Sequence, residues 1–118
     1  MSDEQRIRDA YAAFNARDVE TAVALMAPDV SWPDVADGGF VHGRDDVRRH
    51  WREQFQAVDP RIEPLAFREQ PDGRMAVEVR QLVRSAEGAR ISDDLVHVYT
   101  FRDGLIAGME IVEEPDAR

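Results

Sequence analysis

The sequence contains no cysteine and no lysine, and each absence excludes a class of chemistry. Without cysteine the chain forms no disulfide, carries no thiolate nucleophile and offers no thiolate to a metal. Without lysine it has no Schiff-base amine and no phosphate-loop lysine, since all 15 basic side chains are arginine. The three histidines follow no metal-ligand spacing, and no glycine-rich phosphate loop occurs. We therefore expect no metal and no cofactor.

Positive charge is scarce in the chain, and long apolar runs are absent. There are 24 acidic and 15 basic side chains, a formal net charge of -9, which disfavours nucleic acid and anionic membranes as partners. No apolar run approaches the ~18 residues of a membrane span. The first six residues are polar and unlike a signal peptide. We expect a soluble, cytoplasmic protein that binds neither nucleic acid nor membrane.

Apolar residues recur at helical spacing in three segments of the first half. Residues 3–16 carry an i, i+3, i+4, i+7 stripe that predicts an amphipathic helix. Asp18 predicts the N-cap of a second helix, and Pro28 with Asp29 is expected to end it. A third helix is predicted to begin after Gly43 and to end at Asp59-Pro60.

The second half changes to the alternation of apolar and polar residues that is typical of strands. Residues 75–83 alternate in this way, and two further strands are expected over 91–101 and 105–112. We expect three-residue loops at both hairpins, with Gly88 in the left-handed conformation in the first of them.

Three helices followed by a strongly curved antiparallel sheet predict an α+β fold. The length predicts one domain over residues 1–118, with helices over about 3–56, the sheet over about 60–113 and a tail over 114–118. With three-residue loops, the inner face of the sheet presents Val77, Val79, Leu95, His97, Tyr99, Phe101, Ala107, Met109 and Ile111. The outer face then presents Leu82, Val96, Val98, Thr100, Ile106 and Val112. An outer strip this apolar predicts a homodimer formed through the sheet.

Four segments carry a resemblance to a known family. They are Phe14-Asn15-Ala16-Arg17-Asp18, the run 24–30, Val41-His42-Gly43-Arg44 and the run 98–106. With them the chain resembles, over nearly its whole length, the SnoaL-like and ketosteroid-isomerase-like domains of the nuclear-transport-factor-2-like superfamily. The resemblance implies a cystatin-like α+β roll shaped as a cone around a pocket. The superfamily includes isomerases, polyketide cyclases, epoxide hydrolases, dehydratases and binding modules, so the fold leaves the activity open.

The resemblance also implies roles for individual residues. The general base of ketosteroid isomerase falls on Asp34, and the acid of that family's oxyanion hole falls on His97. The family's tyrosine on the first helix falls on Ala10. Tyr11 lies about 100° further around the helix, so it is not expected simply to replace that tyrosine. The chain thus keeps a carboxylate at the position of the base, has a histidine in place of the acid of the oxyanion hole, and lacks the tyrosine of the first helix.

The sequence leaves two classes of function open. In the first, the protein is a cofactor-independent enzyme of the isomerase, cyclase or dehydratase kind, in which Asp34 is the catalytic base and His97 donates a hydrogen bond or relays a proton. The substrate pocket, for a small apolar molecule that carries oxygen, is expected to be formed by Tyr11, Phe14, Trp32, His50, Trp51, Tyr99, Phe101 and Met109. In the second, Asp34 caps a turn and His97 is a satisfied core histidine. The protein is then a ligand-binding or dimerisation module without chemistry.

Overall fold

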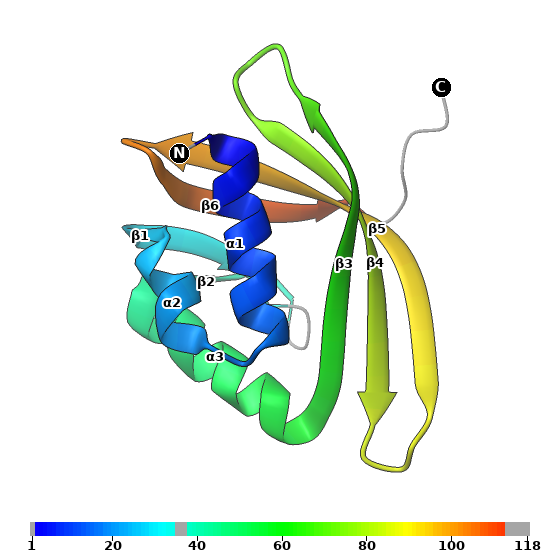
Figure 1. Cartoon of the computed structure of the whole chain (residues 1–118). Helices are drawn as coiled ribbons and strands as arrows, with labels where there is room; N and C mark the ends of the chain where they lie inside the picture. The colour runs from blue at the N-terminus through cyan, green and yellow to red at the C-terminus, as the bar shows by residue number, and fades with distance from the viewer. Residues whose placement is uncertain (1, 35–37, 113–118) are drawn as a thin grey trace.

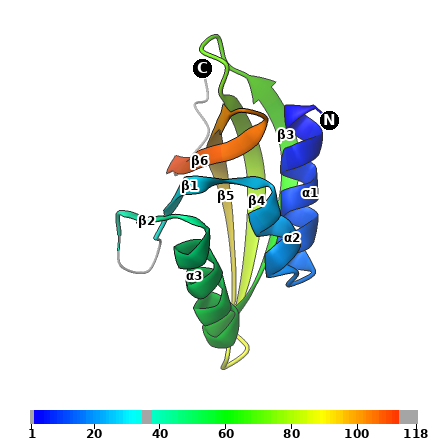
Figure 2. The same ribbon diagram turned by 90° about the vertical axis from the view of Figure 1, so that its left-hand side faces the viewer.

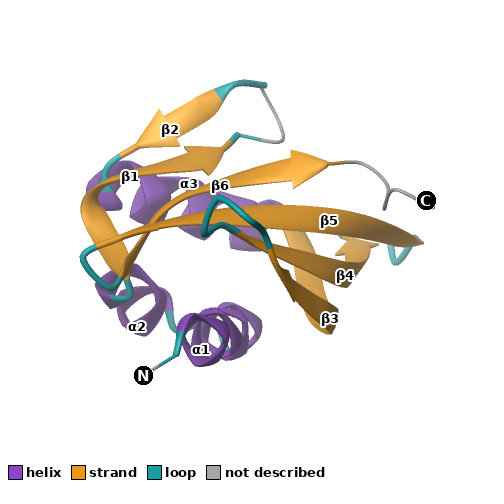
Figure 3. Ribbon diagram, turned by 90° about the horizontal axis from the view of Figure 1, so that it is seen from above, coloured by secondary structure: helices purple, strands orange, loops and turns teal. Residues whose placement is uncertain are grey.

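The computed structural model describes residues 2–34 and 38–112 as three helices and six strands (Figure 1). In chain order these are α1 (Asp3–Asn15), α2 (Val19–Ala24), β1 (Met26–Pro33), β2 (Phe40–His42), α3 (Arg44–Ala57), β3 (Val58–Glu69), β4 (Met75–Ser85), β5 (Arg90–Arg102) and β6 (Leu105–Val112). The helices pack on the concave side of one curled sheet, as the view from above shows (Figure 3). The predicted α+β fold is confirmed. The expected tail over 114–118 lies outside the described residues.

Side chains at the helix starts satisfy amide groups that the first turn leaves unbonded. Ser2 Oγ accepts a hydrogen bond from the backbone N–H of Gln5 at 3.0 Å, at the start of α1. Asp18 accepts one from the N–H of Thr21 at 3.3 Å, which confirms it as the N-cap of α2.

The predicted end of the second helix was wrong. Helix α2 ends at Ala24, and Pro28 and Asp29 lie within strand β1. Proline tolerates a strand where its missing N–H is not needed. The register between β1 and β6 shifts between Met26 and Ser31, and Pro28 falls within this irregular stretch.

The strands form one sheet in the order β2-β1-β6-β5-β4-β3. Four of the five strand pairs are antiparallel as predicted, but β1 pairs with β6 in parallel, so the sheet is mixed. Parallel neighbours need a long connection between them, and here it contains α3 and the four strands β2, β3, β4 and β5. Strands β1 and β6 run across the direction of β3 and β4, which bends the sheet around the helices (Figure 1).

The two hairpin loops differ in length. Ser85 N–H donates to the Ala89 carbonyl, so the first loop has three residues, and Gly88 has φ +88° as predicted. The second loop has only two residues, Asp103 and Gly104, because Arg102 pairs with Leu105. Both central residues have positive φ, which fits the tight turn that follows the twist of two antiparallel strands.

A β-bulge compensates for the short second loop. The register shifts between Thr100 and Phe101, so Tyr99 still pairs with Met109 and His97 with Ile111, on the predicted inner face. Ile106 does not follow the prediction. It lies on the loop side of the bulge and is completely buried in the core, so its expected place on the outer face was wrong.

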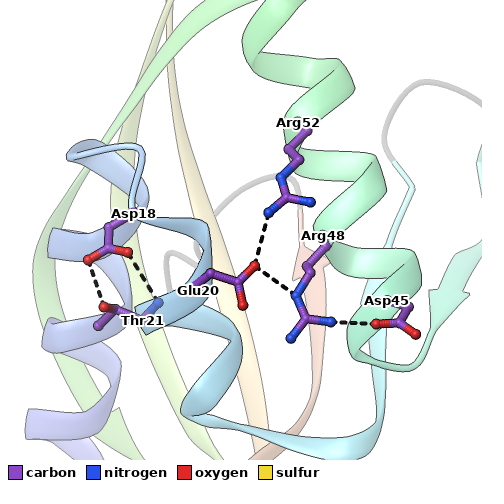
Figure 4. A network of polar contacts seen from close by, with 6 residues as sticks. All are labelled: Asp18, Glu20, Thr21, Asp45, Arg48 and Arg52. Atoms are coloured by element: carbon purple, nitrogen blue, oxygen red, sulfur yellow. Dashed lines mark hydrogen bonds and ion pairs between the residues drawn. The ribbon is translucent and has the colours of Figure 1, made fainter.

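Polar contacts join the helices to one another and to the sheet. Glu20 of α2 accepts hydrogen bonds from Arg48 and Arg52 of α3, each at 2.9 Å (Figure 4). The Asn15 amide donates to the Ile62 carbonyl at 2.8 Å, and its oxygen accepts from the Ile62 N–H at 2.9 Å. These two bonds fix the end of α1 to β3. None of the described helices is long and apolar enough to cross a membrane.

Candidate functional site

An inner chamber lies between helices α1 and α3 and the concave face of the sheet. In Figure 2, α1 and α2 stand on one side and α3 on the other, with β4 and β5 behind them. The chamber is lined by Ala10, Tyr11, Phe14, Trp32, Pro33, His50, Trp51, Gln54, Ile62, Gln81, His97, Tyr99, Met109 and Ile111. Its volume is about 50 Å³, against the ~150 Å³ of an engineered apolar cavity that binds benzene. The chamber therefore admits the end of a ligand and not a whole ring system.

Two polar side chains meet in the wall of this chamber. The Tyr11 hydroxyl of α1 lies 2.9 Å from Nδ1 of His97 on β5, and both side chains are buried. Nε2 of His97 is buried and has no hydrogen-bond partner among the described residues. A buried polar atom without a partner is costly, and in a chamber wall it is a ready contact for a polar atom of a ligand.

Burial keeps this polar group uncharged near neutral pH. It lowers the pKa of His97 to about 4, because a charged imidazolium is poorly stabilised away from water. It also raises the pKa of Tyr11 well above its usual value, and the adjacent Tyr99 raises it further. The pKa of Tyr99 is raised by burial as well. The three groups therefore act as neutral hydrogen-bonding groups and not as a proton acceptor.

Counting protons shows what the pair of Tyr11 and His97 offers. A phenol and a neutral imidazole carry one exchangeable proton each, and the contact between them uses one. If Tyr11 donates to Nδ1, the Nε2–H of His97 remains. If Nδ1–H donates to Tyr11 instead, the O–H of Tyr11 or that of Tyr99, which is hydrogen-bonded to Tyr11, remains. In either tautomer one neutral donor is left for a substrate oxygen.

Aromatic rings form most of the remaining wall. Trp32 and Trp51 meet edge to face, with ring centroids 5.5 Å apart and an interplanar angle of 71°. Phe14 meets Trp51 in the same way at 4.9 Å. Such contacts hold large rings in fixed positions. The result is an apolar slot that ends at the polar pair.

Asp34 belongs to a second, outer chamber. This chamber has a volume of about 580 Å³ and is lined by Asp34, Val41, Arg49, His50, Glu53, Gln54, Ala57, Val58, Gln81 and Val83. His50, Gln54 and Gln81 line both chambers, so the two chambers share this part of their walls. Asp34 is half-buried, at the end of β1, and its backbone N–H donates to the Gly39 carbonyl at 2.9 Å.

The predicted site residues thus fall into three groups. The structure brings seven of them to the inner chamber beside His97: Tyr11, Phe14, Trp32, His50, Trp51, Tyr99 and Met109. Asp34 lies on the wall of the outer chamber and not on that of the inner one. Phe101 packs against the core and lines neither chamber. Within the described residues, no cluster of three His, Cys, Asp or Glu side chains could hold a metal ion.

Sequence reasoning missed three features of the site. It did not expect Tyr11 to reach the position opposite His97, although Tyr11 lies on the buried stripe of α1 four residues after Ile7. It also missed Gln54 and Gln81 in the wall that the two chambers share. Gln54 follows His50 by four residues on α3, and Gln81 continues the inward alternation of Val77 and Val79, so helical and strand periodicity would have found both.

Comparisons with known proteins agree with this architecture. The sequence profile of the SnoaL-like domain family matches residues 7–109. An NTF2-like protein of unknown function from Burkholderia pseudomallei is 30% identical with a TM-score of 0.85, covering 97% of this chain and 92% of that chain. TerC, co-crystallised with polyporic acid, is 31% identical with a TM-score of 0.82, covering 93% and 89%.

A third solved structure shows the fold alone. Rv0760c from Mycobacterium tuberculosis, in complex with estradiol-17beta-hemisuccinate, is 21% identical with a TM-score of 0.78, covering 88% of this chain and 87% of that chain. No curated protein matches the chain.

Proposed function

The chain belongs to the SnoaL-like domain family, and from this premise we propose that it is a cofactor-independent enzyme acting on a small apolar carbonyl compound. The reaction class is proton transfer next to the carbonyl, as an isomerase, cyclase or dehydratase requires. The observation that carries the proposal is the contact of Tyr11 with His97, which leaves one neutral donor and the unpartnered Nε2 in the wall of the inner chamber. A neutral donor aimed at a carbonyl oxygen stabilises the negative charge that develops there as an enolate forms.

In the proposed mechanism the two chambers hold different parts of the substrate. The inner chamber receives the carbonyl oxygen, and the larger outer chamber receives the remaining rings or chain. Asp34 would take the proton from the carbon next to the carbonyl and return it at the next position. For this the substrate must extend past His50, Gln54 and Gln81 toward Asp34. TerC, which is 31% identical to this chain, was co-crystallised with polyporic acid, and this makes polyporic acid a suitable first probe.

The second candidate function is ligand binding without chemistry. The observation that favours it is the position of Asp34, which is outside the inner chamber that holds His97. The two candidates differ in whether bound carbonyl compounds exchange protons.

The binding step can be tested with polyporic acid by isothermal titration calorimetry. We expect wild-type protein to bind and His97→Gln to bind at least about tenfold more weakly, since an amide of another shape replaces the imidazole donor. His42→Gln is the matched control, because His42 is an exposed residue of β2. Equal binding by wild-type protein and His97→Gln would remove His97 from the site.

The chemical step can be tested by deuterium exchange. 1-Tetralone, a planar aryl ketone, is incubated with protein in D2O, and loss of the hydrogen next to the carbonyl is followed by proton NMR. We expect Asp34→Asn to lower the catalysed rate by about 100-fold or more, and to leave binding largely intact, because it removes a proton acceptor and little volume. Asp93→Asn, at an exposed position of β5, is the control. Binding without catalysed exchange would favour the binding module.

We further propose that the protein is a homodimer formed through the outer face of the sheet. Val98 is half-buried there, and Val112 is 46% exposed on the neighbouring strand. Ion pairs between Arg68 and Glu78 and between Arg80 and Asp94 border this strip. Covering apolar surface of this kind is the ordinary driving force for association.

A further inference from the structure

Three arginines stand apart from the other arginines of the chain. Arg61, Arg84 and Arg90 are exposed and have no hydrogen bond or ion pair among the described residues. Each of the other arginines in residues 2–34 and 38–112 contacts a carboxylate or a backbone carbonyl. In a chain with 24 acidic and 15 basic side chains, three unpaired cations are unexpected.

The three arginines also lie together on the sheet. Arg84 of β4 is the direct cross-strand partner of Arg90 on β5, and Leu82 is the partner of both Arg61 on β3 and Ser92 on β5. Like charges directly opposite each other destabilise a sheet. The other cross-strand partner of Arg84 is Asp59 on β3, but the Asp59 carboxylate pairs with Arg17, so Arg84 and Arg90 keep no ion pair among the described residues.

The arginines surround an apolar groove near the β4–β5 hairpin loop. The groove is lined by Asp59, Arg61, Leu82, Val83, Arg84, Arg90, Ile91 and Ser92 and has a volume of about 250 Å³. Leu82 is 39% exposed and Ile91 is 56% exposed, so the lining includes two exposed apolar side chains as well as the cations. The volume is below the ~300–1,000 Å³ of typical small-molecule sites. The groove suits a side chain of a partner better than a whole metabolite.

We propose that this arginine groove docks the acidic surface of a partner protein that presents carboxylates beside an apolar side chain. Arginine pairs with carboxylates through two parallel hydrogen bonds, and the apolar side chain would cover Leu82 and Ile91. Nucleic acid and anionic membranes are worse partners, because their extended negative charge is repelled by the net charge of -9. A protein surface with a local acidic patch avoids most of that repulsion.

The arginine groove adjoins the outer chamber, so docking of a partner would also affect that chamber. Val83 lines both the groove and the outer chamber. A partner seated on the arginines would therefore lie at the side of the chamber that, under the proposed function, holds most of the substrate. That consequence rests on the proposed function, but the docking itself does not.

The docking can be tested by NMR with ¹⁵N-labelled protein and a synthetic probe peptide, acetyl-Glu-Leu-Glu-Glu-Leu-Glu-amide. We expect its addition to shift the backbone amides of residues 82–84 and 90–92, with weaker binding as salt is raised. The double variant Arg84→Glu/Arg90→Glu should bind at least about tenfold more weakly. Arg74→Glu is the matched control, because Arg74 lies in the turn at the opposite end of β4.

A second variant protects the test against misfolding. Arg84→Gln/Arg90→Gln removes the like-charge repulsion, so we expect a melting temperature at or above that of the wild type together with weakened peptide binding. Binding that is unchanged in both double variants would overturn the proposal.

Three other results would also overturn it. Equal binding of the peptide with glutamine in place of glutamate would show that charge is not recognised. Shifts of the same amides by inorganic phosphate with equal affinity would indicate a small-anion site. A change of oligomeric state in the double variants, seen by light scattering, would assign the groove to a contact between copies of this chain.

Discussion

The Tyr11 hydroxyl lies 2.9 Å from Nδ1 of His97, although 86 positions separate the two residues in the chain. The contact joins α1 to the middle of β5 inside the core. Both side chains are buried, so the contact is shielded from bulk water. The contact therefore fixes the position of the imidazole in the chamber wall, and its removal has consequences for stability as well as for binding.

Tyr11→Phe should lower the free energy of unfolding by about 1–2 kcal/mol, since it removes a buried hydrogen bond and leaves Nδ1 of His97 without a partner. Urea denaturation at pH 7.5 measures the change. The double variant with His97→Gln completes a mutant cycle, in which the two losses should not add. Additive losses would mean that the two side chains do not interact.

The stability of the protein should depend on pH through His97. Burial lowers its pKa from the usual 6.5 to about 4. Between pH 4 and pH 6.5 the imidazole of the unfolded chain binds a proton that the folded chain does not bind. The contribution of neutral His97 to the free energy of unfolding is therefore fully present above pH 6.5 and is lost as the pH falls toward 4. This loss is on the order of 3 kcal/mol. Urea denaturation at pH 5.0 and 7.5 should give a smaller difference for His97→Gln than for the wild type. His42→Gln should keep the wild-type difference, and an unchanged dependence in His97→Gln would contradict the assignment.

The contacts of Glu20 with Arg48 and Arg52 should contribute little to stability. The Glu20 side chain is 60% exposed and that of Arg52 is 58% exposed, so water and salt screen the charges. Glu20→Gln should lower the free energy of unfolding by less than about 1 kcal/mol, and the difference should vanish in 1 M NaCl. Glu87→Gln, in the β4–β5 loop, is the control. A loss that persists at high salt would mean that the contact acts through packing.

Val98→Glu should weaken the proposed dimer, because it places a carboxylate in the contact from both subunits. Light scattering at micromolar concentration should show a wild-type dimer and a smaller species for the variant. Ala12→Glu, at an exposed position of α1, should leave the mass unchanged. A wild-type monomer under these conditions would refute the dimer.

Local patterns in the sequence predicted most of the fold because they depend on neighbouring residues. The stripe of α1, the cap at Asp18 and the glycine loop at Gly88 are decided by residues within one or two turns. The parallel pairing of β1 with β6 and the bulge after Thr100 depend on strands that meet only in the folded chain. The sequence carried no local signal for either, and Ile106 was assigned to the wrong face for this reason.

The site was predictable in its composition but not in its grouping. Helical and strand periodicity brought Tyr11, Trp51 and Tyr99 to the inner side, and the structure places all three in the chamber wall. The distance between Tyr11 and His97 depends on how far α1 is rotated against the sheet, which no local pattern specifies. The division of the cavity into two chambers, with Asp34 in the outer one, depends on the side chains in the wall that the chambers share.

Trp32 and Trp51 are the only tryptophans of the chain, and both face the inner chamber with their rings 5.5 Å apart. All tryptophan emission of the protein therefore originates at one place, and rings at this spacing couple in their excited states. An unlabelled sample thus carries its own optical reporter. The emission maximum and the near-ultraviolet circular dichroism should change together when the chamber is filled, and ligands can be screened in a cuvette before any substrate is known.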